Sequence, residues 1–111
     1  YSNHVQYIDS AILPIMKSIL NSSDNPPVIV LTGDHGADSA NRLGILSAYY
    51  FPDGQAANIP ENTSLVNGFR YVFNYVYGSD LPILENKSYL STQTEPYRFT
   101  DYSETMPKCM P

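Results

Sequence analysis

One aspartate–histidine pair offers the clearest chemistry in this chain. The segment Gly33-Asp34-His35-Gly36 places a carboxylate next to an imidazole, between two glycines. Asp supplies a hard anionic oxygen and His a borderline nitrogen, and both are ligands of divalent ions such as zinc or manganese. The glycines would let the backbone turn sharply and approach a ligand closely. The alternative is a plain turn in which Asp34 caps a helix and His35 lies on the surface, and the spacing alone does not decide between the two.

Other reactive residue types give weaker candidates. His4 stands at the start of a predicted helix and is expected to lie on the surface. Asp38 is close to the pair in sequence but is expected to be solvated or to act as a cap. Arg42 could reach an anionic substrate, although a surface ion pair is the commoner fate of an arginine. Cys109 has no nearby His in the sequence, which argues against a nucleophile.

The Asp–His pair directly follows a short apolar run, residues 28–31 (Val-Ile-Val-Leu). A run of this length between turn-forming residues predicts a strand, and one that is apolar on both faces is typical of a parallel sheet covered on both sides. Ligand sites in open α/β sheets lie at the carboxyl ends of such strands. We therefore expect Asp34 and His35 close together at the end of a strand that is buried on both faces.

Two helices are expected to flank this strand. Residues 4–20 carry apolar side chains at spacings of three and four, with Pro14 as an internal conflict. Residues 64–77 predict a second helix that stops at Gly78. Its apolar stripe is expected to pack against the sheet and consists of Leu65, Val66, Phe69, Val72, Phe73 and Val76.

Further strands are predicted over residues 45–51 and, more weakly, at 89–91 and 97–101. The expected fold class is therefore α/β, a fragment of an α/β sandwich with a mostly parallel central sheet flanked by helices, plus short C-terminal strands. Residues 1–102 would form the domain and residues 103–111 a tail.

Composition narrows the function classes. The chain has 111 residues, with 11 acidic and 6 basic side chains and a net charge of −5. The basic residues are scattered, so nucleic acid is not expected as a partner, because phosphate neutralisation needs clustered Lys and Arg. Apolar residues make up 42%, which predicts a packed core and excludes a disordered chain.

An ordered set of motifs resembles the C-terminal part of sulfatase-type members of the alkaline-phosphatase superfamily, which include phosphoglycerol-transferase-like enzymes. Residues 46–52 are similar to the family's N-A-Y-Y-L-P, and residues 65–74 to its V-N-T-F-R-x-x-x-N, with Gly68 in place of the expected Thr or Ser. The remaining matches, in chain order, are Thr32-Gly33-Asp34-His35-Gly36, Arg42, Gly78-Ser79-Asp80-Leu81-Pro82 and Ser88-Tyr89-Leu90-Ser91.

The resemblance implies a metal-dependent hydrolase or phosphoglycerol transferase that acts on sulfate or phosphate esters. It implies that Asp34 coordinates a divalent metal ion (Mn, Ca, Mg or Zn) and that His35, as a catalytic residue, ligates an ion or contacts the sulfate or phosphate group. The family's nucleophile and other acidic ligands lie in an N-terminal part. The partner of this chain would then be that missing part of the parent, and the chain alone is expected to be inactive. By resemblance the parent would be periplasmic, extracellular or membrane-anchored.

A second reading belongs to another class of function. The chain would then be a non-catalytic α/β association module that uses its tyrosine-rich surface. Either reading leaves apolar surface or an open strand edge, which a second copy could cover to give a homodimer.

Overall fold

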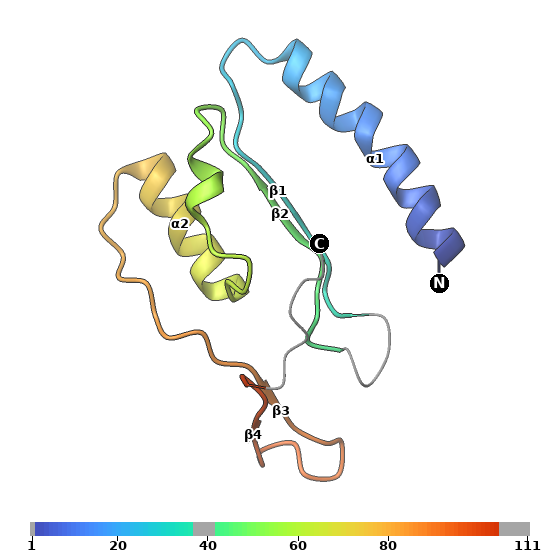
Figure 1. The fold of residues 1–111 in the computed structure, drawn as a ribbon, viewed down its shortest axis with the longest axis vertical. Coiled ribbons are helices and arrows are strands. Elements are labelled where there is room, and N and C mark those ends of the chain that lie inside the picture. The colour runs from blue at the N-terminus through green and yellow to red at the C-terminus, as the bar shows by residue number, and fades with distance from the viewer. Residues whose placement is uncertain (1, 37–41, 105–111) are drawn as a thin grey trace.

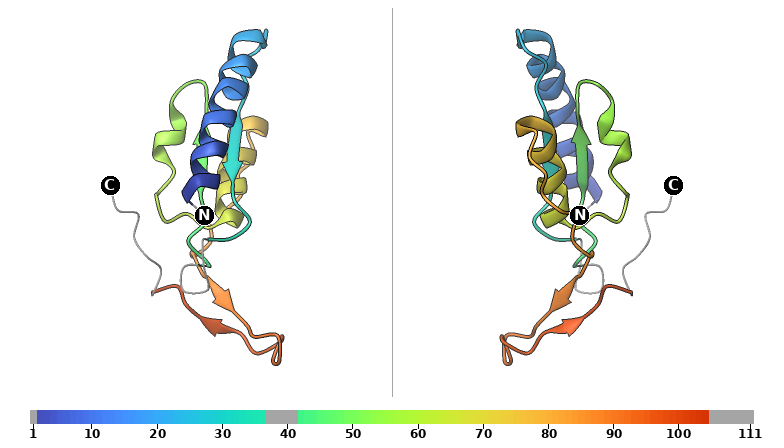
Figure 2. Two further views of the ribbon diagram at one scale, coloured as in Figure 1. Left: turned by 90° about the vertical axis from the view of Figure 1, so that its right-hand side faces the viewer. Right: turned by 90° about the vertical axis from the view of Figure 1, so that its left-hand side faces the viewer.

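A computed structural model describes residues 2–36 and 42–104. Strands β1 and β2 run through the middle of the molecule, with α1 on one side and α2 on the other (Figure 1). A hairpin of β3 and β4 projects from one end, and the side views show the same arrangement (Figure 2). The elements are α1 (Ser2–Ser22), β1 (Ile29–Thr32), β2 (Ser47–Tyr50), the 3-10 turn η1 (Gln55–Asn58), α2 (Leu65–Tyr77), β3 (Tyr89–Leu90) and β4 (Thr100–Asp101).

The sheets are antiparallel and short, so the predicted mostly parallel central sheet of an α/β sandwich is wrong. β1 pairs with β2 in a register that sets Ile29 opposite Tyr50, and β3 pairs with β4 in the same sense. Within the described residues each sheet has two strands. Gly33 N donates to Leu46 O at 2.9 Å, which prolongs the antiparallel β1–β2 ladder beyond the ends of the strands.

Strand β1 is half-buried and not buried on both faces, which corrects a second expectation. A helix lies on each side of the β1–β2 ribbon (Figure 1). Val28 and Val30 line a cavity together with Val72 and Val76 of α2, so apolar side chains of the run meet α2 without the neighbouring strands of a wide sheet.

Both predicted helices are confirmed. α1 continues through Pro14. The Ser64 hydroxyl caps α2 by accepting a hydrogen bond from Asn67 N at 3.3 Å. At the other end Gly78 adopts a left-handed conformation with φ 60°, which glycine reaches without steric cost. No helix among the described residues is long and apolar enough to span a membrane.

The face that α2 turns toward the sheet differs from the predicted apolar stripe. Val66, Phe69, Phe73 and Val76 are between 43% and 60% exposed. The buried residues of α2 are Asn67 and Gly68, a polar and a side-chain-free position.

The reason lies in the aromatic residues of the neighbouring strand. The Tyr49 ring lies against Gly68, where a Cβ atom would stand 2.7 Å from Tyr49 Cζ. Farther along α2, the Tyr75 ring stacks on Phe51 with centroids 4.4 Å apart. The large aromatic rings of Tyr49 and Phe51 therefore lie against the side of α2 that carries Gly68 and Tyr75, whereas four of the six residues of the predicted stripe stay exposed.

Packing in the described residues is loose. The radius of gyration is 16.2 Å, whereas a compact domain of 100 residues has one of about 13 Å. Phe51 is the only apolar side chain that is buried in the described part of the chain. On α1, Ile8 and Ile15 are more than half exposed. The two helices thus present apolar faces that this part of the chain does not cover.

Candidate metal and anion site

The turn after β1 fixes the geometry of the Asp–His pair. His35 Nδ1 lies 2.8 Å from the Gly36 carbonyl oxygen. A carbonyl only accepts, so Nδ1 carries the proton, and Nε2 of the neutral ring keeps its lone pair. One Asp34 oxygen, Oδ1, accepts from His35 N at 3.0 Å, and the other, Oδ2, lies 3.8 Å from His35 Nε2. The structure therefore brings together the two ligand atoms that the sequence singled out.

One ion can contact both atoms. Zinc bonds to His nitrogen and carboxylate oxygen are about 2.0–2.2 Å long, and two such bonds span a separation of 3.8 Å with a bent angle at the ion. The bond from His35 Nδ1 to a backbone carbonyl is the outer-shell contact that orients metal-ligating histidines. The described residues contain no cluster of three or more His, Cys, Asp or Glu that could complete the shell.

Of the remaining candidates, Arg42 is the one that the described residues place near this pair. His4 is exposed on α1. Asp38 and Cys109 lie outside the described residues. Gly33 has an ordinary φ, and a Cβ there would meet its nearest atoms at 3.8 Å, so the turn does not depend on glycine at this position.

We expect only weak metal binding by this chain alone. Two ligands leave most of the coordination shell to water, and catalytic zinc sites use about three protein ligands. Titration calorimetry with zinc and manganese should show no submicromolar site, and Asp34→Ala should abolish whatever weak binding is present. A tight stoichiometric site in the unmodified chain would contradict this expectation.

A cavity of about 630 Å³ lies between the Asp–His turn and the β3–β4 hairpin. His35 and Arg42 line it from the turn, where Gly36 N donates to Arg42 O at 2.8 Å and holds the two segments together. Thr92, Arg98 and Tyr102 line it from the hairpin. An imidazole, two arginines and several hydroxyl-bearing residues therefore line one cavity. This grouping of basic residues is notable in a chain whose net charge is −5.

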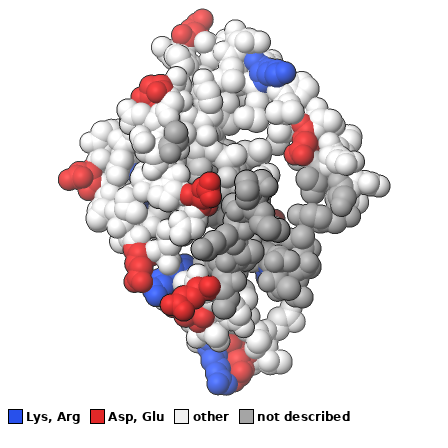
Figure 3. All heavy atoms as spheres, in the orientation of Figure 1, with Lys and Arg blue, Asp and Glu red and all other residues white. Residues whose placement is uncertain are grey.

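The charges around the cavity are partly balanced. Glu95 also lines it, and its carboxylate accepts from the Arg98 guanidinium at 3.2 and 3.4 Å. Among residues 2–36 and 42–104, no carboxylate pairs with Arg42. Figure 3 shows basic and acidic side chains next to one another on the lower part of the molecule, over the hairpin. A divalent oxyanion in the cavity would compete with Glu95 for Arg98 and would meet Arg42 directly.

The sequence did not indicate Arg98 or the hairpin side of this cavity. Residues 97–101 show only a weak alternation, and nothing local places them opposite His35. The sequence offered one signal for Arg98, its residue type, because an acidic chain with six basic residues has few groups that could bind an anion.

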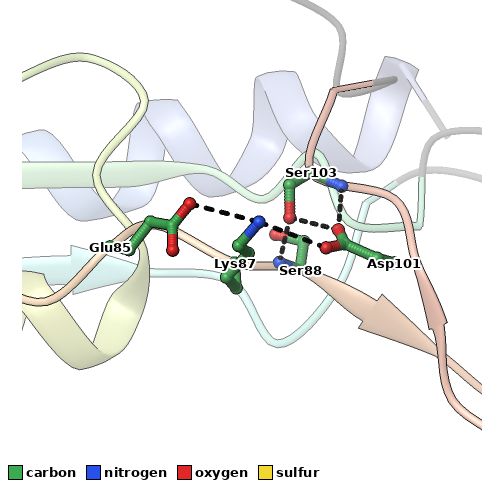
Figure 4. A network of polar contacts seen from close by, with 5 residues as sticks. All are labelled: Glu85, Lys87, Ser88, Asp101 and Ser103. Atoms are coloured by element: carbon green, nitrogen blue, oxygen red, sulfur yellow. Dashed lines mark hydrogen bonds and ion pairs between the residues drawn. The ribbon is translucent and has the colours of Figure 1, made fainter.

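A polar network closes the base of the hairpin (Figure 4). Ser88 N donates to Ser103 Oγ at 2.9 Å, and Ser103 N donates to Asp101 Oδ1 at 2.9 Å. Lys87 Nζ lies 3.2 Å from Glu85 and 3.3 Å from Asp101. Hydrogen bonds from Ser103, and then the Lys87 ammonium, lower the pKa of Asp101. Hydrogen bonds to Glu85 and Asp101 raise the pKa of Lys87.

The base of the hairpin should loosen at both ends of the pH range. The Asp101 contribution is present above its ordinary pKa of 3.8 and is lost as the pH falls through the lower folded value. The Lys87 contribution is present below 10.5 and is lost as the pH rises through the higher folded value. The Ser88 amide resonance in NMR spectra should report both changes. Asp101→Asn should remove the acid-side change, and an unaltered acid-side change in that variant would refute the assignment.

Comparison with known proteins adds no relative in which the same site could be examined. No family model, no curated protein and no solved structure matches the chain.

Proposed function

We propose that this chain supplies one side of a metal-dependent site that acts on sulfate or phosphate esters. The observation that carries the proposal is the cavity in which His35 of the Asp–His turn faces Arg42 and Arg98. Guanidinium groups bind sulfate and phosphate oxygens through paired N–H donors. The ordered motifs that resemble sulfatase-type members of the alkaline-phosphatase superfamily support the same class of reaction.

Each residue has a role in this proposal. Asp34 and His35 would hold a divalent ion, and such an ion would supply polarisation of the sulfuryl or phosphoryl oxygens. Arg42 and Arg98 bind the other oxygens and stabilise the negative charge that develops on them. The nucleophile and the remaining ligands belong to the N-terminal part of a parent chain, which would also cover the exposed apolar faces of α1 and α2. Accordingly, the chain alone should not turn over aryl sulfate or aryl phosphate esters.

An association module is the second candidate. The exposed apolar side chains on both helices favour it, because large exposed apolar surface marks interaction sites. The homodimer expected from an open strand edge also remains a prediction. Sedimentation of the purified chain over a range of concentrations tests it.

Titration with inorganic phosphate and with sulfate, followed by NMR of the isotope-labelled chain, tests the proposed anion site. The amide resonances of Gly36, Thr92 and Arg98 should shift together. Arg42→Ala and Arg98→Ala should each weaken binding about tenfold, the value of one lost charge-assisted contact. Lys17→Ala is the matched control, because it removes the same charge from the exposed surface of α1. Equal weakening by all three variants, or no binding at all, would refute the proposal.

A further inference from the structure

Three polar side chains on α2 hold the extended segment that follows the helix. Asn67, Arg70 and Asn74 are spaced by three and four residues, so they lie on one face of α2. All three contact backbone groups of residues 81–84. These are the polar residues of the motif over residues 65–74.

The two asparagines act on the segment as a neighbouring strand would. Asn67 Oδ1 accepts from Leu84 N at 2.9 Å, and its Nδ2 donates to Leu84 O at 2.7 Å. Asn74 Oδ1 accepts from Leu81 N at 2.8 Å, and its Nδ2 donates to Leu81 O at 2.9 Å. Each side-chain amide therefore satisfies both backbone groups of one residue, as a β-ladder partner does. Between them, Arg70 donates to Pro82 O at 3.0 Å.

Asn67 also reaches toward the hairpin. Its Nδ2 donates to Asn86 Oδ1 at 2.8 Å, and the same oxygen accepts from Ser64 N at 3.0 Å. Asn67 is only 1% exposed, and every polar atom of its side chain has a partner. Asn86 directly precedes Lys87 and Ser88, which form the base of the β3–β4 hairpin.

The part of the hairpin beyond its base is exposed. Residues 91–102 are all exposed, so no buried side chain of that stretch anchors it to the body. At the base of the hairpin, Asn86, which is hydrogen-bonded to α2, directly precedes the network of Lys87, Ser88 and Asp101, and Figure 4 draws that network. Through the peptide bond between Asn86 and Lys87, these polar contacts connect α2 to β4, the strand that follows Arg98.

We propose that Asn67 is a positioning residue for the anion cavity. Through Leu84 and Asn86 it sets where the β3–β4 hairpin carries Arg98 relative to His35. The inference rests on the proposed anion-binding function, although the mechanical link from Asn67 to the hairpin can be measured without any ligand.

Asn67→Asp tests this link with a nearly isosteric change. The carboxylate still accepts from Leu84 N but cannot donate to Leu84 O or Asn86 Oδ1. Affinity for inorganic phosphate should fall about fivefold or more. In the Arg98→Ala background the same change should have no further effect, because the residue that Asn67 positions is gone. Asn62→Asp adds the same charge at an exposed site near the start of α2 and is the matched control. Unchanged affinity in Asn67→Asp, or additive losses in the double variant, would overturn the inference.

Amide hydrogen exchange gives the readout that needs no ligand. Asn67→Asp should speed exchange at Leu84 N and also at Ser88 N and Tyr102 N of the hairpin base, while helical circular dichroism is retained. Asn86→Ala breaks the same link from outside the helix and should do likewise if Asn67→Asp fails to fold. Faster exchange at Leu84 alone would overturn the inference. Absence of phosphate binding in the unmodified chain would instead refute the proposed function and leave exchange at the hairpin to decide the role of Asn67.

Discussion

Phe51→Ala is expected to lower the free energy of unfolding by about 3–5 kcal/mol, the usual cost of emptying a buried phenylalanine site. Phe51 is 4% exposed and stacks on Tyr75 with ring planes 22° apart. Phe51 connects the end of β2 to α2, so its removal would leave a cavity and abolish the ring stacking between the two elements. Urea denaturation followed by circular dichroism measures the loss, and a complete loss of cooperative unfolding would be its extreme form.

Phe73→Ala is the matched control for this prediction. From sequence, Phe73 belongs to the apolar stripe of α2 and would have carried the same cost if fully buried. In the structure it is 43% exposed, so its removal should cost about 1 kcal/mol, a fraction of the value for full burial. A larger loss for Phe73→Ala than for Phe51→Ala would show that α2 packs by the other face.

Gly68→Ala is expected to destabilise the chain by about 1–3 kcal/mol, the range of overpacked interiors. Helix propensity alone predicts the opposite sign, a gain of about 1 kcal/mol. The steric effect prevails because a Cβ at Gly68 would overlap the Tyr49 hydroxyl and stand 2.7 Å from Tyr49 Cζ. The ring cannot move away without giving up the hydrogen bond that Ser47 Oγ donates to its hydroxyl.

A double-mutant cycle separates the two effects. In a Tyr49→Ala background the obstacle is gone, and Gly68→Ala should become stabilising, as in an ordinary helix. Thermal and urea unfolding of the four proteins supply the cycle. Destabilisation of the same size in both backgrounds would mean that Gly68 is required for another reason.

Local patterns were sufficient to predict both helices and the stop of α2 at Gly78, whereas α1 extends two residues beyond each end of the predicted range 4–20. The spacing of apolar residues in α1, and Ser64 and Gly78 around α2, involve contacts within a few residues, so the sequence displays them directly. The rotation of α2 was not predictable in this way. It depends on how Tyr49 and Phe51, which come earlier in the chain, occupy the space beside the helix.

The sheet prediction failed for a related reason. An apolar four-residue strand indicates that both of its faces meet apolar groups, but it does not say whether these come from helices or from a wider sheet. The antiparallel direction is seen in the register of β1 with β2 and in the hydrogen bond from Gly33 N to Leu46 O, and the four-residue run does not encode it.

The candidate site likewise has one part that the sequence predicts and one part that it does not. Asp34 and His35 are adjacent in sequence, so their closeness followed from the motif. Arg98 lines the cavity from the hairpin, whose base is held by side-chain-to-backbone hydrogen bonds, and such contacts leave no periodic pattern in the sequence. The sequence places Asn67 in a family-like motif but does not indicate what the side chain does.

The hydrogen bonds of Asn67 also bear on the chemical durability of the chain. An Asn-Gly pair deamidates readily when the glycine nitrogen can attack the side-chain amide, losing ammonia to form a cyclic imide that water then opens to Asp or isoaspartate. In the folded chain Gly68 N is held by Ser64 O at 2.8 Å, inside the helix, and the Asn67 amide is fixed on Leu84 and Asn86. Each unfolding event frees both groups. Ageing of the protein should therefore leave a permanent covalent mark at Asn67, which accumulates with the time that the chain spends unfolded.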